Sequence, residues 1–116
     1  DLFDLFEGVA HQTLHEKSFQ VSSKTATTVM LVSGGYPNDY EKNKEISGFE
    51  SIENSIVFHA GTSINNNKVV TNGGRVMAIT SLGDSIDEAL SKSYKSIDNI
   101  CFDKMYFRKD IGFDLL

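Results

Sequence analysis

The sequence predicts a small, β-rich α+β domain, with short strands in an antiparallel sheet or sandwich, one helix crossing it and a second helix at the N-terminus. Apolar, β-branched runs alternate with clusters of Gly, Asn, Asp and Ser, as is typical of strands joined by turns. Only two stretches show helical periodicity. A length of 116 residues suits one compact domain, and a hydrophobic content of 40% is typical of a folded chain.

The N-terminal stretch carries apolar side chains at helical spacing. We therefore expect an amphipathic helix from Leu2 to about Leu14. Its apolar side needs a partner, which could be a preceding domain, the body of the chain or a second copy. Because the chain opens at Asp1, without a methionine, we expect it to be a piece of a longer protein.

A connector, Phe19 to Lys24, leads to the first predicted strand, Thr25 to Val32, which is apolar enough to be buried. The strand ends in a run of turn formers from Ser33 to Tyr40. Its paired glycines, Gly34 and Gly35, are a place where a ligand could meet bare backbone.

The next segments read as loop and strand. Glu41 to Glu45 is charged and should face solvent. Ile46 to Asn54 is a loop or short strand with Phe49 and Ile52 turned inward. A short apolar strand follows from Ile56 to Ala60. It carries His59, by default a core or rim histidine, and it closes at Gly61, Thr62 and Ser63 before a polar turn of three asparagines.

The stretch from Lys68 to Thr80 has apolar runs on both sides of Asn72-Gly73-Gly74, which predicts a tight hairpin turn. Arg75 follows at once. A guanidinium beside open backbone N–H groups can grip a phosphate or carboxylate. A structural turn and an anion site both remain open here.

A capping box, Ser85 to Glu88, marks the start of the second helix. Its apolar face consists of Ile86, Ala89, Leu90, Tyr94 and Ile97. Two aromatic-rich segments then predict a closing strand or strand pair, Ile100 to Phe102 and Met105 to Phe107. They lead to Arg108 and Lys109, by default a solvated tail.

Composition excludes several classes of protein. The formal net charge of −5 argues against a general binder of nucleic acid or anionic membranes, so any anion must be gripped locally. A single cysteine, Cys101, allows no internal disulfide, and a reducing, cytoplasmic location is the simplest expectation. No apolar run approaches the roughly 18 residues of a membrane span. We expect neither a nucleic-acid nor a membrane partner.

Several other possible sites are better explained as parts of the structure than as functional sites. His11 and His15 lie four apart, but Gln12 stands where a zinc-protease helix carries glutamate, so no metal site is expected. Neither glycine motif of nucleotide-binding loops occurs. Cys101 lies between apolar neighbours and is expected in the core. Lys68 lacks the methionine neighbours of a biotin-carrier lysine. We expect no catalytic residue in this chain.

What favours function is the combination of motifs. Each of four groups lies at the end of a predicted strand, where one rim of a sheet could gather them. The groups are Gly34-Gly35-Tyr36, His59 to Thr62, Asn72 to Arg75, and Arg108 to Asp110.

These motifs resemble the C-terminal domain of the phosphoribosylamine–glycine ligase family, also called glycinamide ribonucleotide synthetase. The stretches, in the family's order, are Ser33–Tyr40 (SGGYPNDY), Glu41–Gly48 (EKNKEISG), Val57–Thr62 (VFHAGT), Val69–Val76 (VVTNGGRV), Leu82–Glu88 (LGDSIDE) and Tyr106–Gly112 (YFRKDIG). The resemblance runs from about Thr25 to the end and departs at the loop positions Asn38, Asn43 and Ser47.

The resemblance implies that the parent is an ATP-grasp ligase of purine biosynthesis. It would use Mg-ATP to activate glycine as an acyl phosphate, which 5-phosphoribosylamine attacks to give glycinamide ribonucleotide, ADP and phosphate. The Mg-ATP site would lie in a central part that this chain lacks, so no cofactor is expected on the chain, which should be inactive alone.

The resemblance also implies a fold and a domain arrangement. The fold would be of the rudimentary hybrid-motif type, similar to the C-terminal domain of biotin carboxylase. Residues 1–24 would be the tail of the ATP-grasp part, and residues 25–116 the substrate-side domain. The ATP-grasp and N-terminal domains of the parent would be its intramolecular partners.

The family's pocket for the phosphoribosyl substrate implies roles for particular residues. Arg75 would contact the phosphate or ribose, with Gly73 and Gly74 supplying bare backbone. The pocket wall would be formed by Gly34, Gly35 and Tyr36. Hydrogen bonds would come from His59 and Thr62. Additional positive charge would come from Arg108 and Lys109. The alternative is a stand-alone, non-catalytic binding or interaction module with the same fold.

Overall fold

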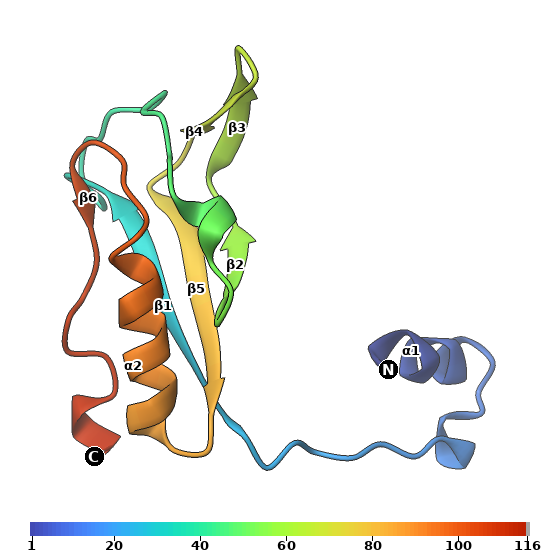
Figure 1. The fold of residues 1–116 in the computed structure, drawn as a ribbon. Helices are drawn as coiled ribbons and strands as arrows, with labels where there is room; N and C mark the ends of the chain where they lie inside the picture. Colours follow the sequence, from blue (N-terminus) through green and yellow to red (C-terminus); the bar gives the residue numbers. More distant parts are fainter. Residues whose placement is uncertain (116) are drawn as a thin grey trace.

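The computed structural model describes residues 1–115 and shows a body built on an antiparallel sheet, with an N-terminal arm that extends away from it (Figure 1). The predicted β-rich α+β class is confirmed. The main sheet has the strand order β2-β5-β1-β6. Its strands are β1 (Thr25–Ser33), β2 (Ile56–His59), β5 (Arg75–Gly83) and β6 (Met105–Tyr106).

A separate hairpin projects from one end of the body (Figure 1). It consists of β3 (Thr62–Asn65) and β4 (Lys68–Thr71). Asn66 and Asn67 form its turn, with φ of 49° and 60°. Positive φ at both central positions is what a type I′ hairpin turn requires.

The hairpin predicted at Asn72-Gly73-Gly74 is therefore wrong. The strand before it, β4, pairs with β3, whereas β5 after it pairs with β1 and β2. Asn72 to Gly74 instead crosses from the small sheet to the large one. Because β4 already has a partner across the Asn66-Asn67 turn, the Asn-Gly step is left to make the crossover.

Helix α2 (Ile86–Ile97) lies across β1 and β5 on one face of the main sheet (Figure 1). Its capping box is confirmed with a shift of one residue. Ser85 Oγ accepts from the Glu88 amide at 3.2 Å, and Glu88 Oε2 accepts from the Asp84 amide at 2.7 Å. A local signal of this kind needs no tertiary context, which is why the sequence predicts it well.

The core lies between α2 and the face of the sheet that it covers. Buried side chains there include Val29, Leu31, Met77, Ile79 and Ile97. Phe49, the first residue of the short 3₁₀ helix η2 (Phe49–Ser51), and Ile52, directly after it, pack against this core as predicted. The opposite face of the sheet is open to solvent, with Ile56, Phe58 and Leu82 each about half exposed.

The first helix is shorter than predicted and does not pack on the body. α1 (Leu2–Ala10) ends before Gln12, whose φ of 59° cannot continue a helix. It contacts the 3₁₀ helix η1 (Leu14–Glu16), and Lys17 bonds back to Asp4 at 2.6 Å. The apolar face of this arm is exposed.

Two further expectations are corrected at the C-terminal end. Cys101 is exposed, not buried. Its neighbours Ile100 and Phe102 take the core positions, because alternate residues of an extended segment point to opposite sides. The strand predicted from Met105 to Phe107 is one residue shorter in the structure, where β6 comprises only Met105 and Tyr106. Beyond it the chain runs beside α2 to the 3₁₀ helix η3 (Phe113–Leu115). Within residues 1–115, no helix has both the length and the apolar character to cross a membrane.

Candidate functional site

Three glycine-bearing loops meet at one end of the main sheet, and we call them the glycine rim: residues 33–36, 60–62 and 72–75. The Ser33 amide donates to Gly74 O at 2.8 Å and the Ser33 hydroxyl donates to Gly73 O at 2.9 Å. The Gly61 amide donates to Arg75 O at 2.8 Å. Loops from β1, β2 and β5 are therefore hydrogen-bonded to one another, as the sequence predicts.

Close approach explains why these positions are glycine. A Cβ on Gly61 would lie 2.7 Å from the Cα of Gly73 and 2.5 Å from the carbonyl oxygen of Arg75. A Cβ on Gly74 would lie 2.0 Å from the ring of Tyr36. The loops can pack this tightly only where no side chain intervenes.

The rim presents backbone donors. Among the described residues, the amides of Gly73 and Gly74 donate no hydrogen bond to the protein. Their carbonyls, by contrast, are bonded to Ser33. Gly73 is partly exposed, whereas Gly74 is buried beneath the ring of Tyr36. The Gly73 amide is therefore open to an incoming anion, and the Gly74 amide becomes open only if the ring moves aside.

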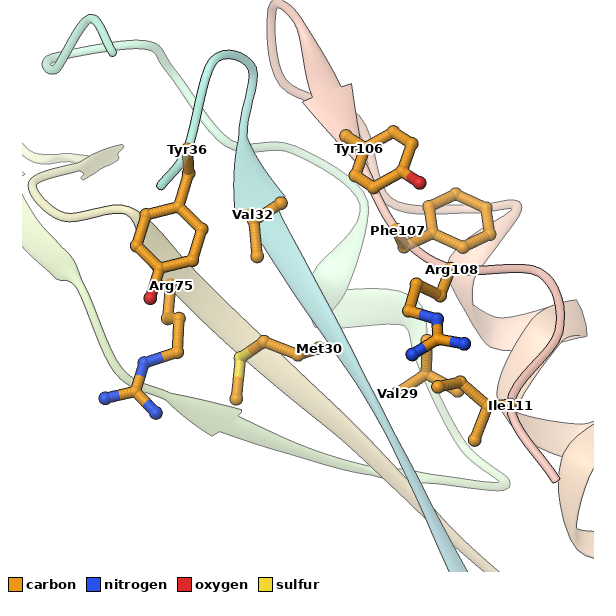
Figure 2. A pocket seen from close by; sticks show the side chains of 9 residues that line it. All are labelled: Val29, Met30, Val32, Tyr36, Arg75, Tyr106, Phe107, Arg108 and Ile111. Atoms are coloured by element: carbon orange, nitrogen blue, oxygen red, sulfur yellow. The ribbon is translucent and has the colours of Figure 1, made fainter. Parts of the chain in front are cut away.

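Arg75 extends from the rim over the open face of the sheet. It is exposed, and it makes no ion pair with any residue in the part of the chain that the structure describes. Val32 lies opposite it in the sheet register, and Figure 2 shows Tyr36 directly above its side chain. A guanidinium with no carboxylate partner keeps its five N–H donors for a ligand.

Below the rim lies a cavity of about 300 Å³ with an apolar floor and an arginine on each side (Figure 2). Arg75 and Tyr36 border one side, and Arg108 and Tyr106 the other. The remaining lining residues are Val29, Met30, Val32, Phe107 and Ile111. The structure thus brings Tyr36, Arg75 and Arg108 around one cavity.

Arg108 is already neutralised within this site. Its Nε and Nη2 atoms donate to the two carboxylate oxygens of Asp110 at 2.8 and 2.7 Å. This hydrogen-bonded pairing raises the pKa of Arg108 and lowers the pKa of Asp110. Lys109 is exposed beside it and does not line the cavity. Arg75 is therefore the cation that the cavity can offer without breaking an existing pair.

His59 and Thr62 bond to each other. The His59 Nδ1 and Thr62 Oγ1 atoms are 3.0 Å apart, and the imidazole lies edge-on to Phe49. His59 is opposite Met77, which faces the core, whereas Arg75 is opposite Val32 on the open face. These two predicted site residues therefore share the rim with Arg75 but face the other side of the sheet.

Sequence reasoning missed part of the cavity. Met30, Val32 and Tyr106 line it, and none was predicted as a site residue. The alternation in the strand TATTVMLV places Met30 and Val32 on the face opposite the buried Val29 and Leu31. This alternation in the sequence is enough to assign Met30 and Val32 to the open face. Tyr106 could be found only from the pairing of β6 with β1.

Comparisons with known proteins agree with this architecture. The model of the family described as "Phosphoribosylglycinamide synthetase, C domain" matches residues 26–114. A phosphoribosylamine–glycine ligase of Caldanaerobacter subterraneus is 40% identical over 97% of this chain and 27% of its own length. A bifunctional purine biosynthetic protein, PUR2,5, of Pichia angusta is 44% identical over 97% of this chain and 14% of its own.

A solved structure also matches. The crystal structure of phosphoribosylamine–glycine ligase from Thermotoga maritima aligns with a TM-score of 0.74 and 30% sequence identity, over 90% of this chain and 27% of that one. In each of these comparisons the chain spans less than a third of the relative's length.

Proposed function

The chain belongs to the phosphoribosylglycinamide synthetase C-domain family, and we propose that it forms the phosphoribosyl side of the substrate pocket in a longer phosphoribosylamine–glycine ligase. That enzyme would join 5-phosphoribosylamine and glycine with ATP to give glycinamide ribonucleotide. Residues 25–116 would be the substrate-side domain, and residues 1–24 the tail of an ATP-grasp part. The enzyme would act in purine biosynthesis in the cytoplasm.

One observation carries this proposal: three glycine-bearing loops meet beside an arginine that has no carboxylate partner among the described residues. In our proposal, Arg75 donates two N–H groups to the phosphate of the substrate. The Gly73 amide donates a further hydrogen bond, as does the Gly74 amide once the ring of Tyr36 moves aside. Tyr36, which follows Gly34 and Gly35 in the sequence, shapes the wall with them. An acidic domain can hold a sugar phosphate in this way because the cation and the donors are concentrated at one point.

The other cations have secondary roles in the proposal. Arg108, fixed by Asp110, and Lys109 add positive potential or anchor a neighbouring domain. His59 and Thr62 offer hydrogen bonds at the rim. Mg-ATP would be held by the ATP-grasp part of the longer protein.

The test is Arg75→Ala in the full-length ligase. Loss of a charge-assisted hydrogen bond to phosphate costs about 1.5–3 kcal/mol, so the KM for phosphoribosylamine should rise roughly 10- to 100-fold. The KM for glycine should change less than about threefold. Steady-state kinetics with each substrate varied in turn gives both values.

Lys95→Ala is the matched control, because Lys95 is also exposed and also has no ion pair among the described residues, but lies on α2 away from the cavity. It should leave both KM values unchanged. An equal rise for both substrates in Arg75→Ala, or no rise, would show that Arg75 is structural.

A further inference from the structure

A network of four charged side chains joins the segments that flank the cavity and is not part of the proposed substrate contacts. Glu41 Oε1 accepts from Lys104 Nζ at 2.8 Å, and Glu41 Oε2 lies 2.5 Å from Lys44 Nζ. Lys44 also pairs with Asp103 at 3.1 Å. The Glu41 carboxylate thus lies between two ammonium groups from segments about sixty residues apart in the chain.

The two segments lead to opposite walls of the cavity. Glu41 directly follows the Ser33–Tyr40 loop, which carries Tyr36. Asp103 and Lys104 directly precede β6, which carries Tyr106. The loop and the turn also touch at Gly34, where an added Cβ would lie 2.6 Å from Lys104 O.

Few other bonds hold these walls together. The pairing of β1 with β6 consists of only two residue pairs, Val32 with Tyr106 and Ser33 with Met105. A single exposed ion pair contributes little, but several charges that share one carboxylate act together. The network therefore supplements the short strand pairing between the two walls.

We propose that Glu41 is a positioning residue, whose carboxylate ties the Ser33–Tyr40 loop to the Asp103–Lys104 turn and so fixes Tyr36 and Tyr106 on either side of the cavity. Glu41 touches no substrate in this arrangement. It acts through the loop that packs on Gly74, next to Arg75. The functional half of this inference rests on the proposed function, and the structural half does not.

We call the ion pairs that Glu41 makes with Lys44 and Lys104 the clamp. Protonation of Glu41 does not break the clamp at ordinary assay pH. Lys104 and Lys44 lower the pKa of Glu41 to about 2. Because the folded-state pKa is depressed, the contribution of Glu41 is present above its normal pKa and is lost only as the pH falls toward 2. The charged groups that face the Glu41 carboxylate are Lys44 and Lys104, and Asp103 lies on the far side of Lys44. The ionisation of Glu41 should therefore not change between about pH 5 and 9, well above its folded-state pKa.

The structural test is amide hydrogen exchange on the 116-residue chain. Glu41→Gln should speed exchange of the Asn38 amide, which bonds to Gly35 O inside the loop, on the order of tenfold, because the loop opens more often. The Ala60 amide, bonded to Val76 O, should not change. Glu41→Asp should restore part of the protection.

Glu45→Gln is the matched control, because Glu45 has the same type of exposed pair, with Lys68 at 2.7 Å, but does not join the two walls. It should leave Asn38 unchanged. Lys104→Met should reproduce Glu41→Gln, and the double variant should be no worse than either single one, since both remove the same link. Unchanged Asn38 exchange, or an equal effect of Glu45→Gln, would overturn the clamp.

The functional test is kinetics of the full-length ligase. Glu41→Gln should raise the KM for phosphoribosylamine on the order of three- to tenfold with kcat within twofold, and Glu45→Gln should change neither. If Arg75→Ala raises that KM and Glu41→Gln does not, the positioning role is wrong. If Arg75→Ala has no effect while Asn38 exchange still rises in Glu41→Gln, the proposed function fails and the structural clamp stands.

Discussion

At the scale of the residue, the contact between Tyr36 and Gly74 positions the proposed phosphate site. The ring of Tyr36 covers the backbone of Gly74, and Arg75 follows directly. Any side chain at position 74 must displace the ring. Tyr36 therefore packs against the backbone position directly before Arg75.

Gly74→Ala tests this contact. The new Cβ would lie 2.0 Å from Tyr36 Cδ2, so we expect a loss of about 1–3 kcal/mol in the free energy of unfolding. The φ of Gly74 lies outside the range that only glycine tolerates, so backbone strain adds nothing. Because the obstacle is a side chain, Tyr36→Ala should relieve most of the added cost. Urea denaturation of the single and double variants gives the values.

Gly61→Ala is the contrasting case. Its Cβ would meet backbone atoms of Gly73 and Arg75, which no side-chain truncation can remove. Tyr36→Ala should therefore give no relief. Equal relief for Gly61→Ala and Gly74→Ala would show that the ring of Tyr36 is not the obstacle.

At the scale of the element, a row of hydroxyl groups joins α2 to the sheet. The Ser81 hydroxyl on β5 accepts from Ser93 at 2.8 Å and lies 2.7 Å from Ser55, which in turn lies 2.7 Å from Ser96. Ser93 also contacts Thr27 at 3.3 Å. Every side-chain polar atom buried in the described residues has a partner. Helix α2 is therefore held on the sheet both by apolar packing and by this row of hydroxyl groups, in which every member has a hydrogen-bond partner.

Ser81→Ala should be costly because Ser81 is 1% exposed and its removal takes a partner from both Ser55 and Ser93. We expect a loss of about 1–3 kcal/mol in the free energy of unfolding. Thr28→Ala is the control. Its hydroxyl pairs with Thr80 at 2.8 Å on the open face, where water can replace it, so the loss should stay below about 0.5 kcal/mol. Similar losses in both variants would show that the row of buried hydroxyl groups contributes no more to stability than an exposed hydroxyl pair.

The elements also show what the sequence could predict. Strands β1 and β2 and helix α2 carry local signals, namely β-branched runs and a capping box, and their positions were predicted within a few residues. The pairing of β4 was not, because the choice between the turns at Asn66-Asn67 and Asn72-Gly73 depends on contacts far along the chain. The pairing of Arg108 with Asp110 was not predicted for a different reason. It depends on side-chain geometry, which the spacing of residues in the sequence does not specify.

At the scale of the whole molecule, the arm stands apart from the body. The radius of gyration is 17.3 Å, against about 13 Å for a compact chain of this size. The apolar side chains Leu2, Phe3, Phe6 and Val9 are more than half exposed. Lys24, at the base of the arm, pairs with Asp84 on the body. The family match begins at residue 26, just beyond the arm.

Deletion of residues 1–21 should therefore leave the body intact. Because α1 and η1 contribute no packing to the core, the urea midpoint should shift by less than about 0.3 M, judged against typical slopes of 1–3 kcal/mol per molar. Circular dichroism follows the transition. A large drop in the midpoint would show that the arm folds back on the sheet and stabilises it.

The glycine rim itself was predicted from the sequence because glycines at strand ends are visible without coordinates. The sequence did not predict that the rim residues divide between the two faces of the sheet, because this depends on strand register. Arg75 and Tyr36 border the cavity, whereas His59 and Thr62 face the other side. Of the four groups predicted to converge, those around residues 34, 61 and 74 meet through hydrogen bonds and close contacts. The fourth, around Arg108, is not part of the rim and lies on the other side of the cavity.

The most direct measurement of the central claim is a crystal structure of the full-length ligase with glycinamide ribonucleotide bound. We expect the phosphate to lie at the glycine rim, with the Arg75 guanidinium at about 2.7–2.9 Å from its oxygens, as charge-assisted hydrogen bonds require. A phosphate bound entirely by other domains, with Arg75 turned away from it, would contradict the account.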